Sequence, residues 1–211
     1  MPLFKTINFN SVTQILVWKI TESYQELYHE VSLTKKSLLR LQGMKSELHQ
    51  CGFLSVRKLL QEAGYNDFDL YYDESGKPHL QGGKFISISH SHQFSTIIIS
   101  DQKAGIDIEM QREKILRIAD KFINIQEFEK IKSFGNQDYI KKLTTKWGAK
   151  EAIFKIRNEK GISFKDHIQV NTFEIECKKT IAILEMENVK QQFSIYFEEF
   201  EGFTLVYAFE N

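Results

Sequence analysis

The apolar residues of this chain follow two periods, and each period predicts a different kind of element. Short runs rich in β-branched and aromatic residues, bounded by polar residues, predict strands. The pattern alternates in Phe85-Ile86-Ser87-Ile88-Ser89, and 94–100 is the expected antiparallel neighbour of this run. The other strand-like runs are 12–20, 104–110 and four runs between 168 and 209.

Apolar side chains spaced three or four residues apart predict helices in three further stretches. Two of them, 22–40 and 46–63, precede the paired strands, and Gly64 is a typical helix terminator. The middle of the chain, 114–157, is also expected to be helical. The order of strand, helices, strands, then helices and strands again indicates an α+β protein with two similar halves. No internal sequence repeat is visible.

The composition excludes several classes of function. Of 211 residues, 42% are hydrophobic and 27% charged, as is ordinary for a soluble globular protein. Equal numbers of basic and acidic residues, 28 of each, argue against a general nucleic-acid binder. No apolar run reaches the roughly 20 residues of a membrane helix, and residues 1–10 lack the features of a signal peptide. Cys51 and Cys177 match no metal or redox spacing, which favours a reducing cytoplasm.

Charge is distributed unevenly along the chain. Residues 141–160 contain seven Lys or Arg and two Glu, a local balance of +5. Residues 174–201 contain seven Glu and three Lys, a balance of −4. The basic stretch is interpreted either as a surface for phosphate or an acidic partner, or as an ordinary solvated helix face.

Two acidic residues share one face of the predicted strand 104–110. Asp107 and Glu109 are two positions apart, whereas Ile106 and Ile108 point to the opposite face. Adjacent carboxylates repel each other unless a cation lies between them, and such hard oxygen ligands suit Mg²⁺ or Mn²⁺. The alternative is an amphipathic edge strand with an acidic outer face.

A second acid lies in the helical segment 146–155. Trp147, Glu151 and Lys155 are one helical turn apart and therefore share a face. Taken alone, Glu151 and Lys155 are a surface ion pair of about 0.3–0.5 kcal/mol.

A Ser-His step ends the strand of residues 84–91. His90 is a candidate phosphate ligand, because the pKa of a histidine lies near neutrality. His79 and His92 are nearby, but their spacing supports no zinc site.

Four short motifs in one order resemble the 4′-phosphopantetheinyl transferase superfamily. Gly76-Lys77-Pro78-His79-Leu80 resembles its Gly-Lys-Pro turn, and Ile88-Ser89-His90-Ser91 resembles its Ser-His step. Gly105-Ile106-Asp107-Ile108-Glu109 and the later Trp147-Gly148-Ala149-Lys150-Glu151-Ala152-Ile153-Phe154-Lys155 resemble its two-part signature. Each motif is weak alone, and the four together in family order are specific.

The resemblance implies transfer of 4′-phosphopantetheine from coenzyme A to a serine of an apo acyl or peptidyl carrier protein, with Mg²⁺ and release of 3′,5′-ADP. It implies a cytoplasmic monomer of two α+β halves related by a pseudo-two-fold, with the active site between them. Residues 1–102 would be the coenzyme A nucleotide side, and 103–211 would carry the metal-binding strand and signature helix. The alternatives are a non-catalytic relative that binds coenzyme A or a carrier, and a metal-dependent phosphohydrolase.

The resemblance also implies roles for the residues of the C-terminal half. Asp107, Glu109 and Glu151 match the Mg²⁺ ligands, and Lys155 matches a phosphate contact. Glu151 is the favoured base for the carrier serine, with Glu127 as the alternate. Trp147 is expected to seat the helix, and Lys150 points about 100° away from Glu151.

In the N-terminal half, the resemblance implies contacts to coenzyme A. Its candidate residues are Lys77, Pro78, Ser89, His90 and Lys45. The sequence departs from the family pattern at 43–53, where Lys45 and His49 are the basic residues, although Arg57 nearby resembles a common family arginine. The sequence therefore does not identify the residue that contacts the coenzyme A 3′-phosphate.

Overall fold

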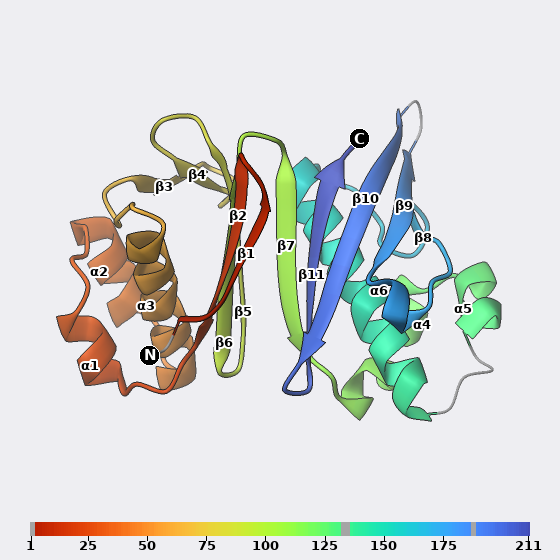
Figure 1. Ribbon diagram of the computed structural model, residues 1–211, viewed down its shortest axis with the longest axis horizontal. Helices are drawn as coiled ribbons and strands as arrows, with labels where there is room; N and C mark the ends of the chain where they lie inside the picture. The colour runs from red at the N-terminus through yellow and green to blue at the C-terminus, as the bar shows by residue number, and fades with distance from the viewer. Residues whose placement is uncertain (1–2, 132–135, 187–188) are drawn as a thin grey trace. The chain divides into compact units, whose positions relative to one another are not determined.

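The structure is a computed structural model that describes residues 3–131, 136–186 and 189–211. The chain divides into two compact units, Met1–Gln102 and Lys103–Asn211 (Figure 1). Each unit contains an antiparallel sheet packed by helices, which confirms the predicted α+β class. The pseudo-two-fold relation between the halves stays a prediction.

The first unit is built on a four-stranded antiparallel sheet in the order β1-β2-β6-β5. The paired strands predicted around 85–100 are confirmed, with Ser89 opposite Thr96. The bounds are β1 Leu3–Asn10, β2 Thr13–Lys19, β5 Phe85–Ser91 and β6 Phe94–Ser100. A smaller sheet pairs β3 (Leu70–Tyr72) with β4 (Pro78–Leu80).

Three helices cover this unit, and they correct one expectation. The stretch 22–40, predicted as one helix, is two: α1 (Tyr24–His29) and α2 (Lys35–Gln42). The reason is local, because Ser23 and Thr34 each cap a new helix by accepting a hydrogen bond from a backbone N–H of its first turn. The third, α3 (Glu47–Glu62), agrees with the predicted helix and ends at Gly64, whose φ is +82°. Apolar residues of α3 and the sheet form one core: Leu16, Trp18, Val56, Leu59, Leu60, Leu70, Leu80, Ile86, Ile97 and Ile99.

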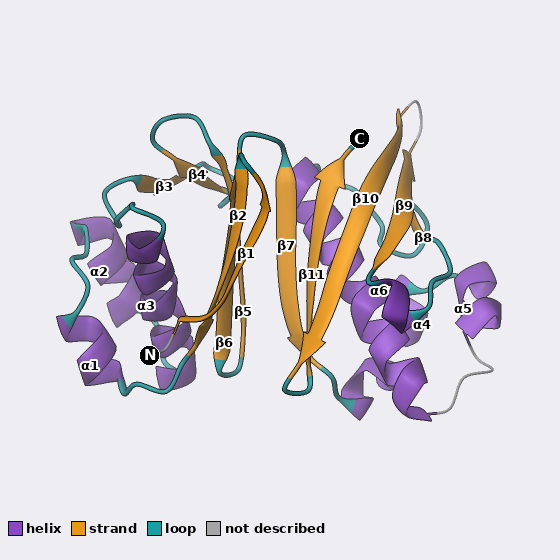
Figure 2. Ribbon diagram, in the orientation of Figure 1, coloured by secondary structure: helices purple, strands orange, loops and turns teal. Residues whose placement is uncertain are grey.

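The second unit contains a five-stranded antiparallel sheet in the order β7-β11-β10-β9-β8 (Figure 2). The strand predicted at 104–110 and the four strand-like runs after residue 168 are confirmed. The bounds are β7 Ala104–Met110, β8 Ile168–Val170, β9 Lys179–Met186, β10 Val189–Phe200 and β11 Phe203–Glu210.

The helical middle of the chain is confirmed in kind but is divided. It comprises η1 (Glu113–Arg117), α4 (Ala119–Phe122), α5 (Ile125–Ile131) and α6 (Asn136–Arg157), while 132–135 lies outside the described residues. A short η2 (Ile175–Cys177) follows later. None of the helices in the described ranges combines the length and apolar character that a membrane span requires.

Helix α6 packs along the sheet of the second unit and organises its core. Ala149, Ala152 and Ile153 of α6 are fully buried against residues of β8–β11 such as Phe193 and Val206. On another side of the helix, the Trp147 ring lies edge-on to Phe122, with centroids 5.1 Å apart. The expected role of Trp147 in seating the helix is confirmed.

Candidate functional site

Two glycines allow α6 to lie directly on the strands that carry the acids. A Cβ atom on Gly105 of β7 would lie 2.0 Å from the carbonyl oxygen of Ala152. A Cβ atom on Gly148 of α6 would lie 2.8 Å from Cγ2 of Val206 and 3.6 Å from Oδ2 of Asp107. Larger side chains would push the helix outward, so the signature glycines set the depth at which strand and helix meet.

Asp107 and Glu109 of β7 lie on the face that turns toward α6, as the alternation predicted. Asp107 adjoins Gly148, and Glu109 lines a cavity of about 170 Å³ together with Thr144 and Trp147 of the helix. Glu151 projects from α6 into the field of both carboxylates. Glu151 is therefore electrostatically coupled to both acids of β7 that the sequence singled out.

The Glu151 carboxylate is partly buried and is repelled by the carboxylates of Asp107 and Glu109. Burial raises the pKa of Glu151 to about 7, and the nearby Asp107 and Glu109 carboxylates add to the rise while Lys155 opposes it. A divalent cation among these oxygens would relieve the repulsion, and carboxylate oxygens are the ligand type that Mg²⁺ and Mn²⁺ prefer.

Lys155 does not pair with Glu151, so the simple surface pair on the helix is wrong. Its ammonium donates to Oδ1 of Asp107 at 2.8 Å and to the carbonyl oxygen of Ile106 at 2.9 Å. In the described part of the chain, no group of three or more His, Cys, Asp or Glu side chains is arranged to enclose a metal ion. The metal role of the three acids stays a prediction.

Glu127 occupies a different and fully buried position. Its Oε1 accepts hydrogen bonds from Lys146 at 3.0 Å and from the Val170 backbone N–H at 3.1 Å. Its Oε2 accepts one from Lys150 at 2.7 Å, and the carboxylate is 2% exposed. These contacts give Glu127 a structural position and leave the proposed alternate base without geometric support.

The two lysines extend this network to the surrounding loops. Lys150 also donates to the carbonyl oxygens of Phe122 and Phe164, and Lys146 donates to that of Val170. Burial lowers the pKa of Lys150 to about 8, although Glu127 acts in the opposite direction. As the helical wheel predicted, Lys150 points away from the acidic group at Glu151.

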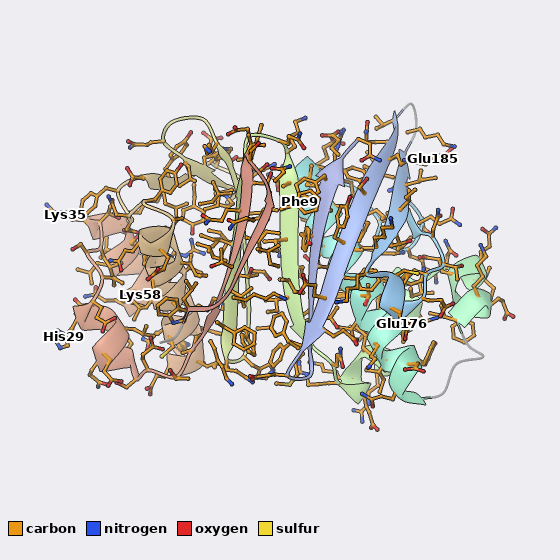
Figure 3. All side chains as sticks on the ribbon, in the orientation of Figure 1. Phe9, His29, Lys35, Lys58, Glu176 and Glu185 are labelled. Atoms are coloured by element: carbon orange, nitrogen blue, oxygen red, sulfur yellow. The ribbon has the colours of Figure 1, made fainter. Side chains whose placement is uncertain are left out.

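The basic stretch 141–160 is not an open basic surface, so that interpretation is wrong. Lys141 pairs with Glu199 at 3.2 Å and Lys142 with Glu174 at 2.9 Å. Both of these acids belong to the acidic stretch 174–201, so the two segments neutralise each other in part. Other acids of that stretch, Glu176 and Glu185, are exposed (Figure 3). Six of the seven cations have a carboxylate partner: Lys141, Lys142, Lys146, Lys150, Lys155 and Arg157.

Exposed cations occur instead on η1 and α4, beside the cavity at Glu109. Arg112 and Lys114 line that cavity, and Arg117 and Lys121 follow on the same segment. All four are exposed, and none forms an ion pair with another described residue. This segment also carries the exposed acids Glu113 and Asp120, and it is a net basic surface next to the acidic group.

His90 lies at a separate cavity in the first unit. The cavity has a volume of about 300 Å³, and its lining includes His49, Phe53 and Tyr72. The His90 ring packs over Gly52, where an added Cβ atom would lie 2.4 Å from its Cδ2. The helix glycine thus makes room for the histidine that the sequence singled out.

Sequence reasoning missed Arg40 at this cavity. Its guanidinium lies over the rings of Tyr72 and Phe53, 4.9 and 5.7 Å from their centroids, and the residue is exposed. The family pattern predicts a phosphate-binding cation within residues 43–53, whereas Arg40 lies before this stretch, in the last turn of α2. Arg57, which also lines the cavity, is 2% exposed and binds Asp67 at 2.9 Å, so its contacts are structural.

The remaining candidates lie around the same unit. Lys77 donates its backbone N–H to Oδ1 of Asp73 at 3.0 Å, which holds the Gly-Lys-Pro turn. Pro78 begins β4 opposite the cavity residue Tyr72. Ser89 is buried on β5 next to His90, and Lys45 is exposed between α2 and α3.

Comparison with known proteins agrees with this arrangement. A protein named 4′-phosphopantetheinyl transferase gsp, from Aneurinibacillus migulanus, is 30% identical over 156 residues. The alignment covers 72% of this chain and 64% of that relative. Residues 103–208, which carry the acids and the signature helix, match the family model described as the 4′-phosphopantetheinyl transferase superfamily. The chain therefore belongs to the 4′-phosphopantetheinyl transferase superfamily.

Proposed function

We propose that this protein transfers 4′-phosphopantetheine from coenzyme A to a serine of an apo acyl or peptidyl carrier protein and releases 3′,5′-ADP. The observation that carries the proposal is the grouping of Asp107, Glu109 and Glu151 where β7 meets α6, within the region that matches the family. Phosphoryl transfer requires charge neutralisation at the pyrophosphate, and three acids that bind a cation satisfy this requirement.

In this proposal, Asp107, Glu109 and Glu151 hold Mg²⁺, with Mn²⁺ as a possible substitute. When bound, the cation neutralises charge on the pyrophosphate and on the leaving 3′,5′-ADP. Lys155 lies beside Asp107, from where its ammonium can contact a phosphate oxygen.

Glu151 is our candidate for the proton acceptor. The serine oxygen attacks the pantetheine-side phosphorus, the bond from that phosphorus to the bridging oxygen breaks, and the serine proton passes to a base. Glu151 is the candidate because its carboxylate projects from α6 into the field of Asp107 and Glu109, beside the proposed position of the reacting phosphate.

We propose that the first unit binds the nucleotide portion of coenzyme A at the His90 cavity. His90 and Arg40 supply polar and cationic groups there, and Tyr72 supplies an aromatic face. Lys45, Lys77, Pro78 and Ser89 are the further candidates on this side. Arg40 is the new candidate for the 3′-phosphate, because it is an exposed cation that already lines the cavity.

We propose that the carrier is acidic and approaches η1 and α4 rather than the stretch 141–160. Arg112 and Lys114 are exposed at the rim of the cavity that Glu109 also lines, so a bound carrier would lie next to the reacting groups. Reversing both charges (Arg112→Glu with Lys114→Glu) should raise the KM for an acidic carrier while the KM for coenzyme A stays unchanged.

The test of the function is a transfer assay against a panel of apo carriers with coenzyme A and Mg²⁺. Mass spectrometry should show a carrier heavier by one phosphopantetheine, with loss of the product for Asp107→Asn. Glu176→Gln, which changes an exposed acid, serves as the control and should retain activity. No adduct on any carrier would contradict the proposal.

A non-catalytic relative that binds coenzyme A or a carrier is the alternative, and the pairing of Asp107 with Lys155 is the observation in its favour. Such a protein would bind coenzyme A by calorimetry without modifying a carrier. A phosphohydrolase would instead release phosphate from coenzyme A without a carrier. The cytoplasmic location and the monomeric state stay predictions.

A further inference from the structure

One ammonium group links the signature helix to the acidic strand. Lys155 of α6 donates to Oδ1 of Asp107 at 2.8 Å and to the carbonyl oxygen of Ile106 at 2.9 Å. The Asp107 side chain is 6% exposed, whereas that of Lys155 is 26% exposed. A nearly buried carboxylate therefore has a cationic partner that can still reach solvent.

We propose that Lys155 is a replaceable counter-ion, which holds Asp107 in the metal-free protein and leaves it when a divalent cation binds. The inference rests on the proposed metal role of Asp107, and it adds a second state for Lys155. The lysine would then serve two groups in turn, the carboxylate before loading and a phosphate oxygen afterwards.

The charges of the site support an exchange rather than a permanent contact. A nearly buried carboxylate without a cation is costly, so Lys155 stabilises Asp107 as long as no metal is present. A divalent cation on the same carboxylate would repel the ammonium at this short range. Asp107 can therefore favour one of the two cations at a time.

The other lysines of the helix show what a permanent contact looks like. Lys146 and Lys150 have side-chain exposures of 2% and 0%, and each donates to a carboxylate and to backbone carbonyls inside the unit. Their ammonium groups have no route to solvent without local opening. Lys155 has the same kind of partners but keeps an open side, which a replaceable ion needs.

Lysine-selective acetylation followed by peptide mass spectrometry tests the exchange in the wild-type protein. In metal-free buffer Lys155 should react slowly, and saturating Mg²⁺ should raise its rate by about tenfold, because an ammonium in a charge-assisted pair is less available than a free one. Asp107→Asn should remove the protection without Mg²⁺. Lys141, which is 28% exposed and paired with Glu199 at 3.2 Å, is the matched control and should not respond.

Calorimetry supplies a second measurement. Lys155→Met should bind Mg²⁺ about tenfold more tightly than the wild type, because no ammonium has to be displaced. Lys142→Met should leave the Mg²⁺ affinity unchanged. Unchanged Lys155 labelling in a protein that binds Mg²⁺ and modifies a carrier would overturn the inference and leave the proposed function standing. Failure of the wild type to bind millimolar Mg²⁺ would overturn the inference and the metal assignment together.

Discussion

Two clusters of acids and lysines lie against helix α6. One has more lysines than acids, and the other has more acids than lysines. On one side, Lys146 and Lys150 share the single carboxylate of Glu127, and all three side chains are at most 2% exposed. On the other side, Lys155 pairs with Asp107 at 2.8 Å and is partly exposed, and Glu151 lies in the field of the Asp107 and Glu109 carboxylates. In the first cluster two lysines bind one carboxylate, whereas in the second Glu151 and the two acids of β7 repel one another.

This difference separates structure from function on one helix. In the Glu127 cluster each charged group forms an ion pair within the unit, so the cluster requires no bound ion. In the Asp107 cluster the like charges of Glu151, Asp107 and Glu109 oppose one another, so a bound cation would stabilise it. Signature residues thus fall into two groups: Lys150 locks the helix to its loops, and Glu151, the next residue, faces the acids.

Removal of the Glu127 carboxylate should produce the largest effect on stability. Glu127→Ala leaves two buried lysines without their acid, and we expect a loss of about 3–5 kcal/mol in the free energy of unfolding. Guanidinium unfolding measures it. Glu176→Ala, at an exposed site, should stay within about 0.5 kcal/mol. A comparable small change for Glu127→Ala would remove the distinction between the clusters.

In the acidic cluster, the expected effect is on activity. Glu151→Gln should lower the transfer rate by about 10²–10³-fold, because it removes a charge that acts on the reacting groups. Its melting temperature should be equal to or above that of the wild type, because the neighbours Asp107 and Glu109 then face a neutral side chain. A wild-type transfer rate would contradict the assignment.

The two clusters should also give opposite pH dependences. The pKa of Glu151 is raised from 4.5 to about 7, so the folded metal-free protein binds a proton that the unfolded chain has lost. Its contribution to stability is present below pH 4.5 and is lost as the pH rises to about 7, a change of about 1–2 kcal/mol after allowance for solvent screening. Glu151→Gln, and also saturating Mg²⁺, should flatten this part of the unfolding profile.

For Lys150 the sign is reversed. Its pKa falls from 10.5 to about 8, so the unfolded chain holds the proton more tightly and stability rises with pH between these values. The contribution is lost as the pH falls through 8. Subtraction of the Lys150→Met profile from that of the wild type isolates it, and a slope of the same sign as that of Glu151 would contradict the comparison.

The smallest expected effect is on coenzyme A binding in the first unit, where two arginines differ as the two clusters of α6 do. Arg40 is exposed at the His90 cavity, whereas Arg57 is buried and bound to Asp67. Arg40→Ala should raise the KM for coenzyme A by about three- to tenfold with little change in kcat, because it removes one partly solvated phosphate contact. Its melting temperature should not change, whereas that of Arg57→Ala should fall. Steady-state kinetics and calorimetric scans measure both.

The sequence predicted what depends on local period and missed what depends on tertiary partners. The alternation in β7 placed Asp107 and Glu109 on one face, and the helical period placed Glu151 and Lys155 together. The partner of Lys155 lies 48 residues away along the chain, so no local pattern could reveal it.

Two other errors have different causes, one tertiary and one local. Charge counting interpreted residues 141–160 as a binding surface or a solvated helix face, because the pairing of Lys141 with Glu199 is visible only after the sheet has formed. The division of 22–40 into two helices could have been predicted, since Ser23 and Thr34 are strong capping residues. The helical spacing of 22–40 predicts a single helix only when the capping residue Thr34 inside it is ignored.

The pairing of the basic and acidic stretches has a consequence for the synthesis of the chain. The ribosome makes proteins from the N-terminus, so residues 141–160 emerge before Glu174 and Glu199, the acids that pair with Lys142 and Lys141. During that interval Lys141 and Lys142 lack these two carboxylates, and residues 1–160 carry more basic than acidic residues. Synthesis of β10 supplies Glu199. The neutral charge of the finished protein therefore conceals a cationic stage in its biogenesis.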